Sequence, residues 1–268
     1  MSSLIEGIRI LPTFSEDEPE LRLSEISRRL GLSKGNTHRL LTMLVSEGLI
    51  RRDAHSARYR LGLGLYELGQ VALSEVDLRP ALPHMMEIGR ITEETILLGV
   101  LDDLDVVYVQ RVESPHNLRV THGPRERGPV HCTATGKVLI AWKPEQEIER
   151  FIRHGLPKHS ARTITDPDQF RQTLHDVREH GFAINDQERE MLIRSVSAPV
   201  RDSRGVVVAA VTVAGPSQRL ARPRFQRVID LVMTSASAIS ADLQRPREAS
   251  RRVSRAEPDD ELQTSRAG

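Results

Sequence analysis

Residues 22–61 constrain this chain more than any other segment, because their spacing predicts two short helices joined by a tight turn and followed by a small hairpin. Ile26 and Leu30 are four residues apart and fall on one side of the first helix, for which Ser24 is the expected N-cap. Gly31 suits the left-handed position that ends a helix. Ser33 is the expected N-cap of the second helix. This arrangement is typical of a winged helix-turn-helix.

The second helix separates an apolar side from a polar one. Thr37, Leu40, Leu41 and Leu44 follow the i, i+3, i+4, i+7 spacing of a buried stripe. The other faces carry small, polar and basic residues, as a helix that enters the major groove of DNA does. We therefore predict DNA contacts at Ser33, Lys34, Gly35, Asn36, His38, Arg39 and Thr42 in the helix, and at Arg51, Arg52 and Arg58 in the wing.

The charge of this segment supports a nucleic-acid partner. Residues 22–60 contain nine Lys and Arg residues against three acidic ones, whereas the whole chain has 38 basic and 37 acidic residues. A basic patch on a balanced protein is typical of a phosphate-binding surface. Aromatic residues make up only 3% of the chain, which favours double-stranded DNA over single strands that stack on aromatic rings.

Length and composition indicate a protein with more than one domain. A chain of 268 residues favours about two domains. One cysteine excludes a disulfide framework and a cysteine-rich zinc site. No apolar run approaches a membrane span, and the N-terminus does not follow the plan of a signal peptide, so we expect a cytoplasmic protein with no cofactor and no membrane partner.

The chain divides into four predicted parts. Residues 3–61 form the winged helix-turn-helix, with Leu4, Ile5, Ile8 and Leu11 expected on the inward side of an opening helix. Residues 62–79 form a linker helix whose three glycines predict a loose start. Residues 80–243 form a second domain that begins near Pro80 and Pro83. Residues 244–268 are polar and charged, and we expect this tail to be disordered.

The second domain alternates strands and helices. The expected strands are 95–101, 106–112, 118–121, 181–185, 195–201 and 206–214, and the expected helices are 133–142, 145–154, 168–180 and 223–243. Hairpin turns at 102–105 and 202–205 join neighbouring strands. The pattern predicts an antiparallel-rich sheet with helices on one or both faces.

Four short motifs could suggest catalysis or metal binding. Residues 31–35 match Gly-x-Ser-x-Gly, but a helix rather than a strand precedes Ser33. Gly136-Lys137 lacks the first glycine of a phosphate loop, because position 131 is histidine. His175 and His180 are five apart, which places them on different faces of a helix. His131 and Cys132 are adjacent, and a packed thiol is the favoured interpretation of Cys132, with oxidation sensing second. The sequence therefore predicts no catalytic residue and no metal site.

Several segments together resemble the IclR-type bacterial transcription regulators. They are Leu30–Leu41, Arg58-Tyr59-Arg60-Leu61-Gly62, Val106–Val112, Pro129–Leu139, Arg162–Thr165 and Gly181–Gly215. The similarity extends over about residues 3–243. It implies an α+β protein with an N-terminal winged helix-turn-helix, a linker helix and a C-terminal GAF-like mixed sheet with flanking helices. It also implies a homodimer or homotetramer whose binding to operator DNA is controlled by a small organic acid effector.

The resemblance also implies effector-binding positions. They are Ala134, Thr135, Gly136, Asn185, Ser195, Thr212 and Ala214. Relatives that bind small oxo-acids tend to carry Asp, Cys, Ser and Ser at the last four positions, so Asn185, Ser195 and Ala214 depart from that pattern. Residues 186–195 resemble instead the branch that governs aromatic-acid catabolism, although the usual glycine near position 192 is missing. We therefore expect a carboxylic acid, aromatic or related, as the effector.

The alternative class is an enzyme or small-molecule sensor that uses its trihelix only for protein interaction. Loss of DNA binding in Arg39→Ala would favour the regulator, whereas turnover of a metabolite by the second domain would favour the enzyme.

Overall fold

The computed structural model describes residues 3–15, 17–72, 77–121, 127–222 and 224–245. They divide into two compact units, Met1–Asp77 and Leu78–Gly268. Most of the predicted disordered tail, from residue 246 onward, lies outside the described residues, as do residues 73–76 of the predicted linker helix. None of the described helices combines the length and apolar character needed to cross a bilayer.

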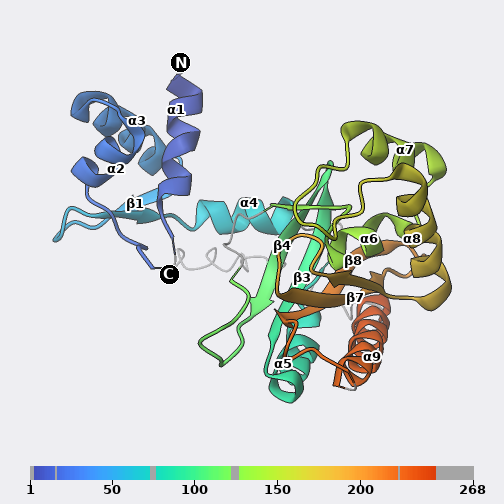
Figure 1. Cartoon of the computed structure of the whole chain (residues 1–268). Coiled ribbons are helices and arrows are strands. Elements are labelled where there is room, and N and C mark those ends of the chain that lie inside the picture. Colours follow the sequence, from blue (N-terminus) through green and yellow to red (C-terminus); the bar gives the residue numbers. More distant parts are fainter. Residues whose placement is uncertain (1–2, 16, 73–76, 122–126, 223, 246–268) are drawn as a thin grey trace, which may run out of the picture. The chain divides into compact units, whose positions relative to one another are not determined.

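The N-terminal unit is a winged helix-turn-helix (Figure 1). Its elements are α1 (Ser3–Ile10), a 3-10 turn (Leu11–Thr13), α2 (Leu23–Leu30), α3 (Lys34–Ser46), β1 (Ile50–Arg52), β2 (Tyr59–Leu61) and α4 (Gly64–Ala72). β1 and β2 pair antiparallel and form the wing. The core includes Ile26, Leu40, Leu41 and Ile50, so the predicted stripe of α3 is its buried face.

The turn between α2 and α3 follows its local sequence. Gly31 ends α2 with φ of +66°, and the Ser33 side chain caps α3 by accepting a hydrogen bond from the backbone N–H of Asn36. The predicted N-cap of α2 was wrong. Arg22 occupies that position instead of Ser24, and its backbone N–H donates to the Glu25 carboxylate at 2.6 Å. A carboxylate on the third helical residue can satisfy the helix start, whichever residue stands at the cap.

The predicted inward face of α1 was also wrong. Leu4, Ile5 and Ile8 are 70%, 50% and 56% exposed, and only Leu11 packs partly against the core. The buried residues of α1 are Gly7 and Ile10. A side-chain carbon added at Gly7 would lie 3.8 Å from Leu40 of α3, an ordinary contact distance, so α1 packs on α3 through the side that carries Gly7 and Ile10. The larger apolar stripe of α1, formed by Leu4, Ile5 and Ile8, therefore faces outward.

The start of the linker helix is more constrained than its glycines predict. Gly62 donates its N–H to Leu49 at 2.8 Å, and Gly64 donates to Gly48 at 3.2 Å. A side-chain carbon on Gly62 would lie 2.0 Å from the Gly48 carbonyl oxygen. Glycine is needed there because the two backbones touch, not because the segment is loose.

The C-terminal unit is built on a six-stranded sheet of order β5-β4-β3-β8-β7-β6 (Figure 1). Its strands are β3 (Thr95–Asp102), β4 (Asp105–Val112), β5 (Arg127–Pro129), β6 (Ala183–Asp186), β7 (Ile193–Arg201) and β8 (Val207–Pro216). All pairings between these described strands are antiparallel, in keeping with the predicted antiparallel-rich sheet.

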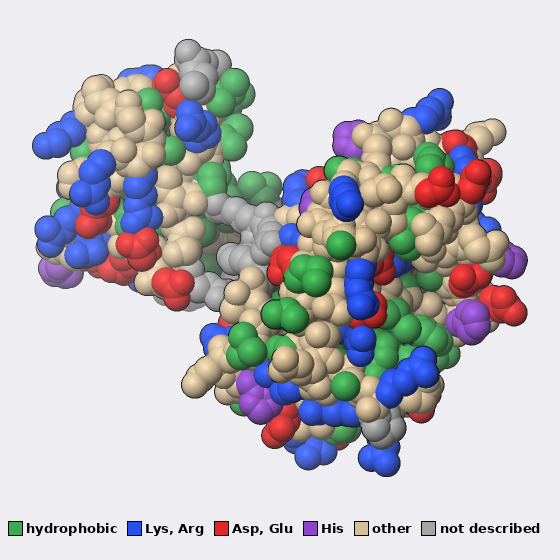
Figure 2. All heavy atoms as spheres, viewed as in Figure 1, with side chains coloured by type: hydrophobic (Ala, Val, Ile, Leu, Met, Phe, Trp, Pro, Cys, Tyr) green, Lys and Arg blue, Asp and Glu red, His purple; other side chains and the backbone are tan. Residues whose placement is uncertain are grey.

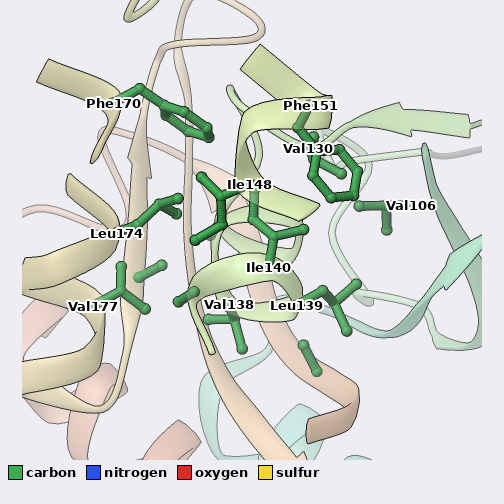
Figure 3. Close-up of a cluster of buried hydrophobic side chains, with 14 residues drawn as sticks. Val106, Val130, Val138, Leu139, Ile140, Ile148, Phe151, Phe170, Leu174 and Val177 are labelled. Atoms are coloured by element: carbon green, nitrogen blue, oxygen red, sulfur yellow. The ribbon is translucent and has the colours of Figure 1, made fainter. Parts of the chain in front are cut away.

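Helices cover both faces of this sheet. They are α5 (Ala81–Thr92), α6 (Ala134–Ala141), α7 (Glu145–His154), α8 (Pro167–His180) and α9 (Arg224–Gln244). α5 and α9 lie on one face, and α6, α7 and α8 lie on the other (Figure 1). Side chains from α6, α7 and α8 form a core with Val106 and Val130 (Figure 3), and every residue of α6 is buried.

Three elements of this unit differ from the sequence prediction. α5 and β5 were not predicted, and the strand expected over Leu118–Thr121 is not a strand. The Thr95 hydroxyl donates to the Val120 carbonyl at 3.1 Å, and the Arg219 guanidinium donates to the Leu118 carbonyl at 2.9 Å. Hydrogen bonds from side chains, and not pairing with a neighbouring strand, thus hold residues 118–121 in place.

Candidate nucleic-acid interface and effector pocket

The polar face of α3 gathers the predicted DNA-binding residues. Lys34, Gly35, His38, Arg39 and Thr42 are exposed, as is the capping residue Ser33. Figure 2 shows Lys and Arg side chains gathered on the N-terminal unit, with acidic side chains beside them. The leucine side of α3 is buried, so the helix presents its cationic side outward.

Asn36 is the one predicted helix contact that is half-buried. Its amide nitrogen donates to the Glu6 carboxylate of α1 at 2.8 Å, and its amide oxygen accepts from Arg39 at 3.1 Å. Glu6 therefore orients Asn36, and Asn36 in turn orients Arg39. The sequence analysis missed Glu6, because its partner lies 30 residues away.

The wing separates its three predicted arginines. Arg51 and Arg52 are exposed on β1, and the Arg52 guanidinium lies 5.8 Å from the centre of the Tyr59 ring. Arg58 is half-buried and donates to the Glu20 carbonyl at 3.3 Å, which turns it toward the body of the unit. Arg60 is exposed opposite Arg51 and was not among the predicted contacts.

Asp53 shapes the tip of the wing. Its Oδ1 accepts hydrogen bonds from the backbone N–H of Ser56 at 2.7 Å and of His55 at 3.0 Å, and from the Ser56 hydroxyl at 2.9 Å. These hydrogen bonds, those of Ser56 above all, lower the pKa of the Asp53 carboxyl below its ordinary value. The wing therefore carries an ionised acid within a basic surface at neutral pH.

A small cavity of about 20 Å³ lies in the C-terminal unit where β6, β7 and β8 meet the segment after β6. Asn185, Ser195, Thr212 and Ala214 line it, as four of the seven predicted effector positions. The remaining lining residues were not predicted: Leu97, Tyr108, Thr133, Arg189, Glu190 and Ile193. The lining thus combines an apolar side with hydroxyls, an amide, a guanidinium and a carboxylate.

A chain of hydroxyl groups runs behind this cavity. Thr135 and Thr212 lie 2.8 Å apart through their hydroxyl oxygens, and Thr212 also donates to Ser197 at 2.8 Å. The Tyr108 hydroxyl lies 3.4 Å from that of Thr135. Thr135 is completely buried and reaches the cavity through Thr212. Chains of this kind hold polar groups in fixed orientations inside a protein.

The other two predicted effector positions are packed inside the C-terminal unit. Ala134 and Gly136 are buried in α6 and do not line the cavity. The Gly136 N–H donates to the capping hydroxyl of Thr133 at 3.1 Å, so this N–H is already used within the helix start. A side-chain carbon on Gly136 would lie 2.3 Å from the Val130 backbone, which requires glycine there.

The segment after β6 closes the cavity with a strained turn. Gln187 and Leu192 have φ of +65° and +68°, in the left-handed region that favours glycine. The Asn185 side chain accepts a hydrogen bond from the Glu188 N–H at 2.8 Å, and the Gln187 side chain accepts one from the Leu192 N–H at 3.1 Å. The expected glycine near position 192 is thus replaced by a leucine that keeps the glycine conformation.

A buried ion pair anchors this segment to α6. The Lys137 ammonium donates to the Glu188 carboxylate at 2.6 Å and to the Ile184 carbonyl at 2.9 Å. Lys137 is only 1% exposed, and its burial lowers the pKa of the ammonium group against the opposing effect of Glu188. Gly136-Lys137 therefore has a structural role, because it joins α6 to the segment that closes the cavity.

The remaining short motifs of the sequence analysis also have structural roles in place of catalytic ones. α2 precedes the Gly-x-Ser-x-Gly match at 31–35, where Ser33 is a helix cap. His180 bonds to the carbonyl of Asp176 one helical turn earlier. Cys132 is completely buried, and burial raises the pKa of its thiol to about 12. Such a thiol is protonated at neutral pH unless a bound cation displaces its proton, in line with a packed residue.

Two family models match the chain. Residues 3–54 match the IclR helix-turn-helix domain, and residues 70–241 match the C-terminal domain of bacterial IclR transcriptional regulators. The chain belongs to the IclR family. It is therefore a DNA-binding transcriptional regulator with a C-terminal effector domain, and its α+β fold agrees with the sequence prediction.

Similar proteins agree with this assignment. The HTH-type transcriptional regulator KdgR of Escherichia coli is 36% identical over 245 residues, which cover 91% of this chain and 93% of KdgR. The crystal structure of the Thermotoga maritima IclR has a TM-score of 0.75 at 26% identity, over 91% of this chain and 99% of that one. These IclR-family relatives are named as regulators, so the chain is not an enzyme.

One further solved structure is an IclR homologue from Microbacterium hydrocarbonoxydans complexed with 4-hydroxybenzoate. Its TM-score is 0.74 at 28% identity, over 90% of this chain and 99% of that one.

Proposed function

We propose that this regulator binds operator DNA through α3 and its wing, and that a small carboxylic acid, aromatic or related, controls this binding from the pocket between β6, β7 and β8. The observation that carries the proposal is the presence of Arg189 among the lining residues of the cavity, beside apolar side chains, hydroxyls, the Asn185 amide and the Glu190 carboxylate, which lies 3.8 Å from the Arg189 guanidinium. A guanidinium matches a carboxylate in charge and geometry.

The DNA contacts follow from the exposed face of α3. Lys34, Gly35, His38, Arg39 and Thr42 face outward and are proposed to enter the major groove, with Asn36 held at their edge by Glu6. Arg51 and Arg52 are proposed phosphate contacts of the wing. Arg58 is turned toward Glu20, which gives it a supporting role in the wing.

The pocket residues suggest how an aromatic acid is recognised. Leu97, Tyr108 and Ile193 offer apolar surface to a ring, while Thr212, Ser195 and Asn185 offer hydrogen bonds to a ring substituent. The homologue complexed with 4-hydroxybenzoate supports this class of ligand, because that acid combines a carboxylate, a ring and a hydroxyl.

The small size of the cavity couples binding to a structural change. A volume of about 20 Å³ is close to that of a single water-sized probe. An aromatic acid therefore enters only if the segment 186–192 moves outward. The strained residues Gln187 and Leu192 bracket the part of the chain that has to move.

We also propose that the protein forms a homodimer or a homotetramer. Tyr66, Leu68 and Val71 of α4 are 64%, 59% and 70% exposed, in addition to the outward apolar side of α1. Apolar surface of this kind is typical of an interface between protein chains, and doubling a helix-turn-helix increases its affinity for a two-part site. Because operator DNA is the partner, we propose that the protein acts in the cytoplasm.

Fluorescence anisotropy with a labelled duplex from the region upstream of the protein's own coding sequence tests the proposal. We expect binding that weakens steeply with salt, and we expect Arg39→Ala to cost about 1–3 kcal/mol of binding free energy. Arg153→Ala removes the same charge from an exposed site on α7 and should have little effect. If Arg39→Ala binds as tightly as the wild type, α3 does not read the operator.

The effector is tested in the same assay with 4-hydroxybenzoate and, for comparison, pyruvate. We expect 4-hydroxybenzoate to change operator affinity and pyruvate to have a much smaller effect. Arg189→Gln should remove the response while DNA binding without effector is kept. A response that survives Arg189→Gln would show that the carboxylate binds elsewhere.

A further inference from the structure

Three potential metal ligands converge beneath the start of α6. The ligand atoms of His131, Cys132 and His159 all lie within 4.8 Å of one another. His131 and Cys132 come from the loop before α6 and are buried, while His159 comes from the loop after α7 and is exposed. The chain thus brings together side chains from two separate segments.

We propose that His131, Cys132 and His159 bind a zinc-like transition-metal ion. Imidazole nitrogen and thiolate sulfur are ligands that zinc prefers, whereas calcium and magnesium prefer oxygen. The site is separate from the effector cavity, because none of the three residues lines it.

The surroundings of His131 favour a ligating role. Its Nε2 lies 2.9 Å from the Pro157 carbonyl oxygen, which can only accept a hydrogen bond. Nε2 therefore carries the proton, and the lone pair of Nδ1 is left for a metal. Most metal-binding histidines donate their second ring nitrogen to a carbonyl or carboxylate in this way.

The spacing of the three ligands requires only a small adjustment. Zinc–sulfur and zinc–nitrogen bonds of roughly 2.3 and 2.0 Å in a tetrahedral site place the ligand atoms about 3.3–3.6 Å apart. The ligand atoms now lie within 4.8 Å of one another, so the longest of these separations has to shorten by somewhat more than 1 Å at most. His159 is exposed at the surface of a loop, so rotation of its side chain can supply the movement.

A buried carboxylate oxygen adds negative charge to this region. Oε2 of Glu188 is buried and has no hydrogen-bond partner among the described residues, because Lys137 bonds to the other oxygen. Glu188 lies outside the cluster of three converging ligands, and its ion pair with Lys137 ties it to α6.

A metal at this position would fasten two segments that support the pocket. Thr163 donates to the Glu188 carbonyl at 2.6 Å, and Ser160 donates to the Gln187 carbonyl at 2.7 Å. The loop that carries His159 therefore already holds the segment that closes the cavity. An ion would tie this loop to the start of α6.

Metal titration of the full-length protein, without a histidine tag and after chelator treatment, tests the proposal. Zn²⁺ affinity is measured in competition with a chromophoric chelator, and Co²⁺ is added separately to detect a thiolate-to-cobalt absorption band. We expect one ion per chain and a cobalt band that disappears in Cys132→Ser. His159→Asn should weaken Zn²⁺ binding at least about tenfold.

His154→Asn is the matched control, because it removes another exposed histidine from the end of α7. Its Zn²⁺ affinity should equal that of the wild type. The proposal is overturned if Zn²⁺ does not saturate at one equivalent, if Co²⁺ gives no thiolate band, or if His159→Asn binds Zn²⁺ unchanged. Should Cys132→Ser fail to fold, His159→Asn still decides, since its side chain is exposed.

Discussion

The Glu6 carboxylate of α1 accepts a hydrogen bond from the Asn36 amide of α3, with 2.8 Å between the two atoms. An acidic residue thereby lies beside a surface whose proposed partner is a polyanion. Repulsion from phosphate makes this arrangement costly for DNA binding unless the acid has a positioning role. The bond leaves Asn36 oriented toward Arg39, whose guanidinium donates to its amide oxygen.

Substitutions of Glu6 separate its orienting effect on Asn36 from the effect of its negative charge on DNA binding. We expect Glu6→Ala to raise affinity for unrelated DNA but to lower the ratio of operator to unrelated-DNA affinity about fivefold, since roughly 1 kcal/mol of base discrimination is lost. Glu6→Gln keeps an oxygen that can accept from Asn36 and should preserve the ratio. Competition binding with operator and scrambled duplexes measures it, and equal ratios for Glu6→Ala and the wild type would exclude a positioning role.

The wing offers a second test in which geometry and charge oppose each other. Asp53 is ionised at neutral pH, since its hydrogen bonds lower its pKa, so Asp53→Asn removes one negative charge from a basic surface. Because Asn keeps the Oδ1 acceptor, we expect tighter DNA binding. Asp53→Ala removes the same charge but also the bonds to His55 and Ser56, and should bind DNA more weakly than Asp53→Asn. Equal binding by the two variants in anisotropy would show that the shape of the tip is irrelevant.

The buried pair of Lys137 and Glu188 should be expensive to break from one side. Lys137→Met leaves the Glu188 carboxylate buried and uncompensated, and we expect the free energy of unfolding to fall by about 3–5 kcal/mol. The double variant Lys137→Met/Glu188→Met should recover part of this loss. Lys143→Met removes a lysine from the more exposed pair with Glu147, 3.4 Å apart, and should cost less than about 1 kcal/mol. Urea unfolding measures all three, and similar losses for Lys137→Met and Lys143→Met would contradict the expectation.

Leu192 provides a prediction of increased stability. It has φ of +68° and is 61% exposed, so its side chain contributes little packing to offset its conformation. Leu192→Gly should relieve about 1–2 kcal/mol of strain against about 0.5–1 kcal/mol of added chain entropy on unfolding. The net gain is between about 0 and about 1.5 kcal/mol. Met191→Gly, at an exposed neighbour without positive φ, should instead destabilise. Thermal unfolding compares the two, and destabilisation by Leu192→Gly would disprove the strain.

The sequence predicted best those features that depend on neighbouring residues. The turn at Gly31, the cap at Ser33 and the buried stripe of α3 all follow local rules, and the structure contains them. The helix at 145–154 also begins and ends as predicted. Charge and spacing within one short segment were enough to indicate the DNA-binding unit.

Features that depend on distant partners could not be predicted. The inward face of α1 is set by Gly7 against Leu40, and the segment 118–121 is held by side chains of Thr95 and Arg219. Lys137 and Glu188 are 51 residues apart. Nothing in the local pattern around either residue indicates its partner, so this ion pair and the His131–Cys132–His159 cluster became visible only in the folded chain.

The contact between Gly48 and Gly62 has a mechanical consequence. The two backbones touch, and the Gly64 N–H also donates a hydrogen bond to the Gly48 carbonyl. We therefore expect the segment that follows α3 and the beginning of α4 to move together. A rotation of the start of α4 is thus expected to be passed to the end of α3 through this contact. A larger residue in place of Gly62 would separate the two backbones. Such a variant is expected to bind its effector but to lose the effect of the effector on operator affinity.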